Sequence, residues 1–127
     1  MLNQDKINKS EMSITKRYIK LLLPSLGGNE GGEVDTFTRD GNVGYKFPCP
    51  FCQPFYDDKE VRNKQMGELF EATKMKYSSS SWFFRCRRRG SPDCRGGAKS
   101  FYTFLAMYLP ELFNQYKAEI DAMFKSS

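Results

Sequence analysis

The spacing of hydrophobic residues predicts a helix near the N-terminus. From Ser10 to Leu23, apolar side chains recur three or four positions apart, which places them on one helical face. Pro24 follows, and we expect it to end the helix because proline cannot donate a backbone hydrogen bond. We therefore predict one compact domain overall, which consists of an N-terminal helical segment, residues 1–26, and a main part, residues 27–127. The apolar residues of this helix are Met12, Ile14, Tyr18, Ile19, Leu22 and Leu23.

The next segments have the composition of a β-hairpin. Glu33–Arg39 and Val43–Pro48 flank Asp40-Gly41-Asn42, a sequence that favours a tight turn. The second of these strands ends next to Cys49. The hairpin is therefore predicted to deliver this cysteine at its end.

A second hairpin is predicted to deliver Cys86. Leu69–Tyr77 and Trp82–Arg87 are separated by four serines, although the overlapping segment Met66–Ala72 could also be helical. The polar insert Asp57–Gln65, which precedes this hairpin, is expected to be a loop or a short helix.

Two helices are predicted at the C-terminal end. Phe101, Phe104, Leu105 and Tyr108 repeat at helical spacing, and Pro110 suits the first turn of a new helix. The fold class predicted is α+β, an antiparallel sheet with helices at both ends. The apolar face of the last helix is expected to consist of Leu112, Phe113, Tyr116, Ile120, Met123 and Phe124.

The composition is that of a folded chain without a membrane span. Of the 127 residues, 39% are hydrophobic and 28% are charged, which argues against both disorder and a membrane protein. Met1–Ser10 contains Asp5 and Lys6 but no apolar signal core. We expect a cytoplasmic protein, in which cysteines remain reduced and available to bind metal.

The four cysteines form the pattern C-x2-C, thirty-three residues, C-x7-C, in a chain without histidine. Two chain reversals, each bringing one pair together, can supply the four soft ligands of a tetrahedral zinc site. Disulfides, unrelated buried thiols and a redox C-x2-C motif are the alternatives. The predicted ligands of one structural Zn²⁺ are Cys49, Cys52, Cys86 and Cys94.

A closed site of this kind predicts a protein that is not an enzyme. Four thiolate ligands leave no coordination position for a water molecule. The chain also lacks a phosphate-binding loop and a nucleophile elbow. Function is therefore expected to lie in binding.

Basic residues crowd around the second cysteine pair, in a chain of net charge +5. Five arginines fall within eleven positions, and the planar guanidinium group suits phosphates and base edges. Alternatively, one or two of these cations only offset the negative charge of a zinc tetrathiolate. The predicted nucleic-acid contacts are Arg85, Arg87, Arg88, Arg89, Arg95 and Lys99.

Aromatic residues precede this cluster. Tyr77, Trp82, Phe83 and Phe84 lie on the predicted second hairpin, where alternate side chains face opposite sides of the sheet. Most of these rings are expected in the core. Trp82 is our candidate for an exposed ring on which a single-stranded base stacks.

The motifs and their order resemble the zinc-binding domain at the N-terminus of bacterial and phage DNA primases. Bacterial members usually have histidine at the position of Cys52, so the chain looks more like the phage members with four cysteines. The similarity covers about residues 14 to 124. It runs through Val34–Arg39, Gly41-Asn42, Phe47-Pro48-Cys49-Pro50-Phe51-Cys52, Trp82–Cys86, Gly96-Gly97, Phe104-Leu105, Tyr108 and Pro110-Glu111-Leu112.

This resemblance implies a zinc ribbon that recognises single-stranded DNA where a primer begins. It also implies a separate polymerase domain with the catalytic carboxylates, which would begin where this chain ends. We expect either a fragment or a small free-standing protein of phage or mobile-element origin, and Met1 favours the latter. The arginine-rich loop before Cys94 is longer than the family norm, and the insert after Cys52 differs from the family's.

A different function is also compatible with the sequence. A zinc ribbon could dock on a polymerase, helicase or recombinase through its aromatic C-terminal helices. Exposure of Phe101, Tyr102 or Phe113 would favour this adaptor hypothesis.

Overall fold

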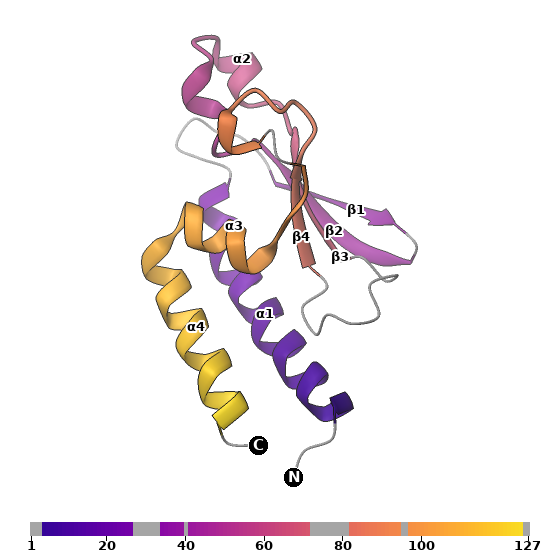
Figure 1. The fold of residues 1–127 in the computed structure, drawn as a ribbon. Helices are drawn as coiled ribbons and strands as arrows, with labels where there is room; N and C mark the ends of the chain where they lie inside the picture. Colours follow the sequence, from indigo (N-terminus) through magenta and orange to yellow (C-terminus); the bar gives the residue numbers. More distant parts are fainter. Residues whose placement is uncertain (1–3, 27–33, 40, 72–81, 95–96, 126–127) are drawn as a thin grey trace.

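A computed structural model describes residues 4–26, 34–39, 41–71, 82–94 and 97–125 of the chain. The described part is α+β, as predicted (Figure 1). Its elements are α1 (Gln4–Leu26), β1 (Asp35–Arg39), β2 (Asn42–Phe47), the 3-10 turn η1 (Gln53–Phe55), α2 (Lys59–Arg62), β3 (Gly67–Glu71), β4 (Trp82–Cys86), the 3-10 turn η2 (Pro92–Cys94), β5 (Lys99–Ser100), α3 (Phe101–Tyr108) and α4 (Pro110–Lys125).

The five strands form one antiparallel sheet in chain order, β1-β2-β3-β4-β5. The register pairs Tyr45 with Leu69 and Leu69 with Phe84. Because alternate residues of a strand face the same side, these three residues share one face of the sheet. In β4 this face buries Trp82, Phe84 and Cys86, while Phe83 and Arg85 lie on the other face.

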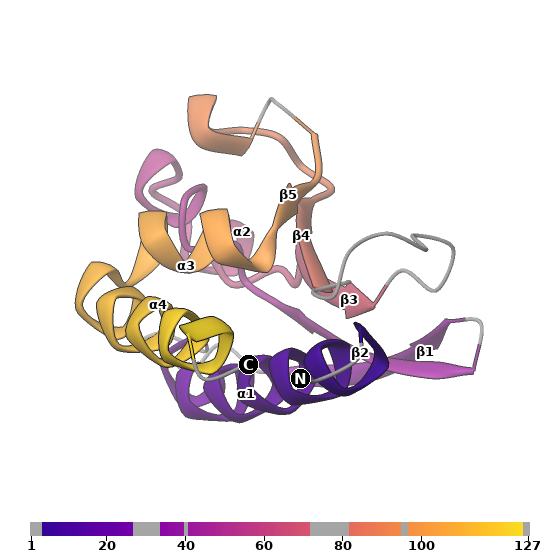
Figure 2. The same ribbon diagram turned by 60° about the horizontal axis from the view of Figure 1, so that its bottom comes forward.

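Helices α1 and α3 lie on that face of the sheet, and α4 packs against both of them (Figures 1 and 2). α1 and α4 run side by side in opposite directions, so the two chain ends lie close together. α3 packs on β4 and β5, and α2 lies at the opposite end of the molecule from the chain ends (Figure 1). No helix among the described residues has the length and apolar character that a membrane crossing requires.

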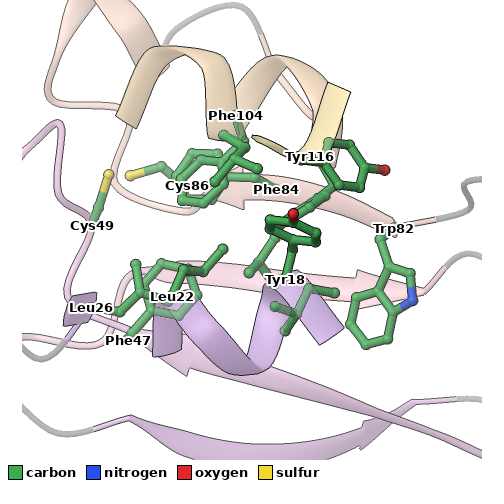
Figure 3. Packing of buried hydrophobic residues seen from close by; sticks show 14 of the residues in the cluster. Tyr18, Leu22, Leu26, Phe47, Cys49, Trp82, Phe84, Cys86, Phe104 and Tyr116 are labelled. Atoms are coloured by element: carbon green, nitrogen blue, oxygen red, sulfur yellow. The ribbon is translucent and has the colours of Figure 1, made fainter. Parts of the chain in front are cut away.

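One hydrophobic cluster joins α1, the sheet and the C-terminal helices (Figure 3). The rings of Phe84 and Phe104 stack with centroids 4.3 Å apart, and Phe47 lies beside both. Between the helices, Thr15 Oγ1 and the Tyr116 hydroxyl form a buried hydrogen bond of 2.8 Å. The cluster therefore includes one satisfied polar pair where α1 meets α4.

The N-terminal helix is longer than predicted, and Pro24 does not end it. α1 continues through Pro24 to Leu26. Leu26 and Leu22 are both buried in the cluster, and their burial holds the last turn in place. The Tyr108 hydroxyl also donates a 3.0 Å hydrogen bond to the Ser25 carbonyl, which satisfies one of the acceptors at the helix end.

The hairpins and C-terminal helices confirm most of the remaining predictions. The turn at Gly41, the short helix within the insert and the helix start at Pro110 are all present. β3 shows that the segment after Met66 is a strand and not a helix. The rest of the predicted strand to Tyr77 and the serine turn lie outside the described residues.

Two further features of the fold differ from the predictions. β5 was not predicted, because its two residues are too few to give a pattern, and Ser100 also caps α3 by accepting from the Thr103 amide. Phe124 was assigned to the buried face of α4 but is 46% exposed, because it lies in the last turn of the helix.

Candidate metal centre

The four cysteines converge at one end of the sheet. Cys49 lies two residues after the end of β2, and Cys86 is the last residue of β4. Cys52 directly precedes the 3-10 turn η1, and Cys94 is the last residue of the 3-10 turn η2. All four side chains are at most 2% exposed, and all four are free thiols. Figure 3 shows the sulfur atoms of Cys49 and Cys86 pointing toward one another. No disulfide joins any two of the four cysteines in this structure.

The distances between the sulfur atoms suit a shared metal ion. All four atoms lie within 4.8 Å of one another, and three of the pairs are 3.4 to 3.5 Å apart. A tetrahedral ion with metal–sulfur bonds of about 2.3 Å places its ligands about 3.8 Å apart. The cluster is thus compatible with one bound metal ion after small shifts of the thiols.

The first cysteine pair is positioned by a backbone turn. The amides of Cys52 and Gln53 both donate to the Cys49 carbonyl, at 3.2 and 3.1 Å. Phe51 between the cysteines packs edge-on against Phe84 and Phe104, which anchors the turn to the core. This half of the site is therefore fixed by local hydrogen bonds and by the hydrophobic cluster.

The second cysteine pair is positioned differently. The Arg89 amide donates to Cys86 Sγ at 3.4 Å, and Arg89 adopts a left-handed backbone with φ of 53°. The Cys94 amide donates to the Ser91 carbonyl at 2.9 Å, and Ser91 is buried. The loop between these cysteines is thus a chain of short turns and contains no regular helix or strand of four residues or more.

Hydrogen bonding and burial shift the pKa values of the cysteine thiols in opposite directions. The hydrogen bond from Cys49, aided by the Arg89 and Arg88 amides, lowers the pKa of Cys86 to about 5. The same hydrogen bond, with burial and the nearby negative charge, raises the pKa of Cys49, and burial raises the pKa of Cys94 to about 12. Without a cation, the cluster favours the Cys86 thiolate and keeps Cys49 and Cys94 protonated, so metal binding would displace protons.

Two of the candidate arginines face a buried carboxylate. Arg85 Nη2 lies 3.4 Å from Glu68 Oε1, and Arg87 Nε lies 3.8 Å from the same oxygen. The Glu68 side chain is only 7% exposed. A buried carboxylate requires such partners, so part of the arginine cluster has a structural role that the sequence did not indicate.

Arg88 and Gly90 contact Tyr56, the aromatic residue directly before the insert. The Arg88 guanidinium lies 4.5 Å from the centroid of the Tyr56 ring, a cation–π contact. Gly90 lies against the same ring, so that a Cβ at this position would overlap Tyr56. Tyr56 thus joins the segment after the first cysteine pair to the arginine loop.

The remaining basic candidates lie at different places. Arg89 is exposed beside the cluster, and the Arg87 side chain is 59% exposed although its Nε faces Glu68. Lys99 donates to the Asp93 carbonyl and lies 5.8 Å from the Phe51 ring centroid. Arg95 lies outside the described residues.

The prediction of an exposed Trp82 is wrong. Trp82 is 4% exposed, because it occupies an inward-facing position of β4 beneath α1 (Figure 3). Its indole stacks on Tyr45, with centroids 6.2 Å apart and an interplanar angle of 21°. It cannot stack a base in this position.

Phe55 and Tyr56 are the residues that sequence reasoning missed. Phe55 is 59% exposed and directly precedes the tyrosine that contacts Arg88. The available signal was a pair of adjacent aromatic residues after the first cysteine pair. It was overlooked because the residues that follow are polar and charged. Comparison with known proteins adds no further candidate, since no protein-family model and no curated protein matches the chain.

Proposed function

We propose that the chain is a non-catalytic, zinc-stabilised nucleic-acid-binding module of DNA-primase type. The observation that carries this proposal is that the sulfur cluster holds a loop with exposed Arg87 and Arg89. Exposed Phe55 directly precedes Tyr56, the ring that Arg88 of this loop contacts. Arginine binds phosphate through its fork of donors, and an exposed ring stacks a base. The combination favours a single strand, because paired bases do not present their faces.

Zinc is the ion that the donor set favours. Four buried sulfur atoms without oxygen or nitrogen ligands match a structural zinc site with four cysteine ligands. Such a site leaves no position for substrate, so the ion would fix the arginine loop and take no part in a reaction. Elemental analysis of protein purified without added metal should find about one zinc per chain. A value near zero in folded protein would contradict the metal proposal.

Binding should be tested with labelled single- and double-stranded DNA and RNA over a salt series. We expect the single-stranded DNA to bind most tightly, with an affinity that falls steeply as salt rises. Replication, recombination or another process on single-stranded DNA would then be the setting.

The contact surface should be tested with charge-matched variants. Arg87→Gln with Arg89→Gln removes two charges at the cysteine end, and Lys117→Gln with Lys125→Gln removes two exposed charges on α4. The first pair should reduce the salt slope by about two, because each lost phosphate contact reduces it by about one. The α4 pair should leave the slope unchanged. Equal slopes in the two variants would refute this surface.

Base stacking has its own matched pair. Phe55 and Phe124 are both exposed phenylalanines, at 59% and 46%, on different parts of the molecule. Phe55→Ala should weaken single-strand binding by about 1–3 kcal/mol, and Phe124→Ala should not. Unchanged binding by Phe55→Ala would contradict base stacking on this ring, and phosphate contacts would then account for the binding.

The adaptor hypothesis has one observation in its favour. Tyr102 is 40% exposed on α3 and packs edge-on against half-buried Phe113, with ring centroids 4.7 Å apart. Phe101, by contrast, is fully buried and cannot serve an interface. A polymerase, helicase or recombinase bound by the wild type but not by Tyr102→Ser would support this second function.

A further inference from the structure

A cleft separates α1 from the turn of the first hairpin, at the end of the sheet away from the cysteines. Its volume is about 290 Å³, which is near the lower limit of small-molecule sites. Trp82 begins β4 and Cys86 ends it, so the cleft lies about 13 Å from the sulfur cluster at the usual rise of a strand. Side chains from both layers line it, among them Lys16, Lys20, Asn42, Val43, Glu71 and Trp82.

Two hydrogen-bond donors in the cleft wall lack an acceptor within the described part of the chain. Trp82 Nε1 and Asn42 Nδ2 are both buried from solvent, and neither has a hydrogen-bond partner there. Trp82 is 4% exposed, and Figure 3 shows its ring nitrogen on the side away from Tyr18 and Phe84. Buried donors are nearly always paired in folded proteins, so two orphaned donors in one wall indicate a missing acceptor.

Two lysines of α1 line the same cleft. Lys16 and Lys20 are four residues apart on α1, so they lie on one face of the helix. Both are exposed, and neither forms an ion pair with another described residue. Glu71, which has interactions of its own, is the one acidic residue among those that line the cleft. The cleft therefore combines two cations and two neutral donors with one carboxylate.

We propose that this cleft binds a phosphate monoester group, supplied either by a free nucleotide or by the 5′ end of a strand. A phosphate monoester offers three terminal oxygens and up to two negative charges. These match the two ammonium groups and the donors of Asn42 and Trp82, which approach from the helix, the hairpin turn and β4. The site rests neither on the metal nor on the arginine loop.

Trp82 gives a local readout, because it is the only tryptophan of the chain. In the full-length protein, titration with inorganic phosphate at constant ionic strength should shift the single indole N–H resonance progressively and to saturation. The same titration should change the tryptophan fluorescence. An indole resonance that does not move, or that moves equally with chloride, would overturn the proposal.

Charge variants test the site without altering its packing. Lys16→Gln with Lys20→Gln should weaken phosphate binding by about tenfold or more, and Glu71→Gln should strengthen it, because each changes the charge beside the anion. Lys117→Gln with Lys125→Gln is the matched control and should change nothing. If both lysine pairs have equal effects, the binding is nonspecific and the cleft is not the site.

Three ligands distinguish the source of the phosphate. Inorganic phosphate, a nucleoside 5′-monophosphate and a pair of oligonucleotides with a 5′-phosphate or a 5′-hydroxyl are titrated against the indole resonance. A nucleotide that binds more tightly than phosphate assigns a free nucleotide, and a 5′-phosphate oligonucleotide that exceeds its hydroxyl partner assigns a strand end. Saturation by the 5′-hydroxyl strand at equal affinity would refute recognition of a monoester.

Discussion

The two ends of the molecule are held by different kinds of contact. At the helical end, long apolar faces of α1, α3 and α4 bury residues such as Leu22, Phe104 and Tyr116. At the cysteine end, η1 and α2 bury no residue, and η2 buries only Cys94. The four cysteines belong to the same hydrophobic cluster, and the short segments around them add few buried residues to it.

This difference indicates why a small chain would use a metal. A short insert and an arginine-rich loop cannot bury enough apolar surface to offset the conformational entropy of ordering them. A metal–ligand cluster orders both segments through four bonds. The helical end needs no such support, so the two ends should respond differently to the same type of perturbation.

Cys86→Ser should have the largest effect. Serine is a poor ligand for a soft-ligand site, and structural zinc contributes about 10–16 kcal/mol in small zinc peptides. We expect zinc per chain to fall from about one to near zero and the cooperative thermal transition to be lost. Circular dichroism melting and elemental analysis measure both effects.

Chelation of the wild type is the matched experiment for this variant. It removes the ion without changing the sequence, and it should reproduce the loss of the transition. An unchanged melting temperature in Cys86→Ser would show that the cysteine end folds without the ion.

Leu22→Ala should damage the helical end while leaving the metal in place. Leu22 is fully buried in the cluster beneath α1, and such truncations cost about 2–5 kcal/mol. The midpoint of urea unfolding should fall accordingly, while zinc per chain stays at about one. Leu21→Ala is the control, since the neighbouring Leu21 is 57% exposed. Loss of zinc at ambient temperature would show that the two ends do not differ in this way.

The sequence predicted the fold well where one local pattern decides the structure. The turn at Gly41, the alternation of side chains along β4 and the break before Pro110 each follow from a few adjacent residues. Pro24 could not be placed correctly, because burial of Leu26 decides where α1 ends. Tertiary packing overrides a local signal there.

The candidate site was predictable in its ligands but not in its surroundings. Soft side chains in two pairs indicate a shared centre whatever the fold, and the structure brings the four sulfur atoms together. The burial of Trp82 depends on which face of β4 the helices cover, and the strand pattern alone leaves that choice open. The partners of Glu68 and Tyr56 arise from contacts between distant segments, which no spacing reveals.

Gly90→Ala should loosen the arginine loop with a smaller loss of stability. The new methyl group would overlap the Tyr56 ring, whose Cζ lies 3.1 Å from the position of that carbon. Overpacking of this kind costs about 1–3 kcal/mol, which urea unfolding can resolve.

A double-mutant cycle identifies the cause of that loss. In the Tyr56→Leu background the overlap is gone, so Gly90→Ala should cost less than in the wild type. Equal costs in the two backgrounds would assign the effect to the backbone of the loop and not to the tyrosine.

Glu119→Gln should have the smallest effect, at the helical end, and it should depend on pH. Glu119 accepts hydrogen bonds from Tyr18 and Arg17 across α1 and α4, and these partners, the tyrosine first, lower its pKa. A lowered pKa in the folded state adds stability above the unfolded value of about 4.3, and this stability is lost as pH falls through the folded value. Because both acid and arginine are partly exposed, the free energies of unfolding of wild type and variant should differ by under about 1 kcal/mol.

Urea unfolding at several pH values tests this prediction. Burial and the same carboxylate raise the pKa of Tyr18 to about 12, so the difference in free energy of unfolding should stay constant from pH 6 to pH 8. Loss of the proposed metal ion at low pH would affect both proteins alike, so the comparison between them remains valid. A difference that grows as pH falls below about 4 would contradict the expected direction of this pH dependence.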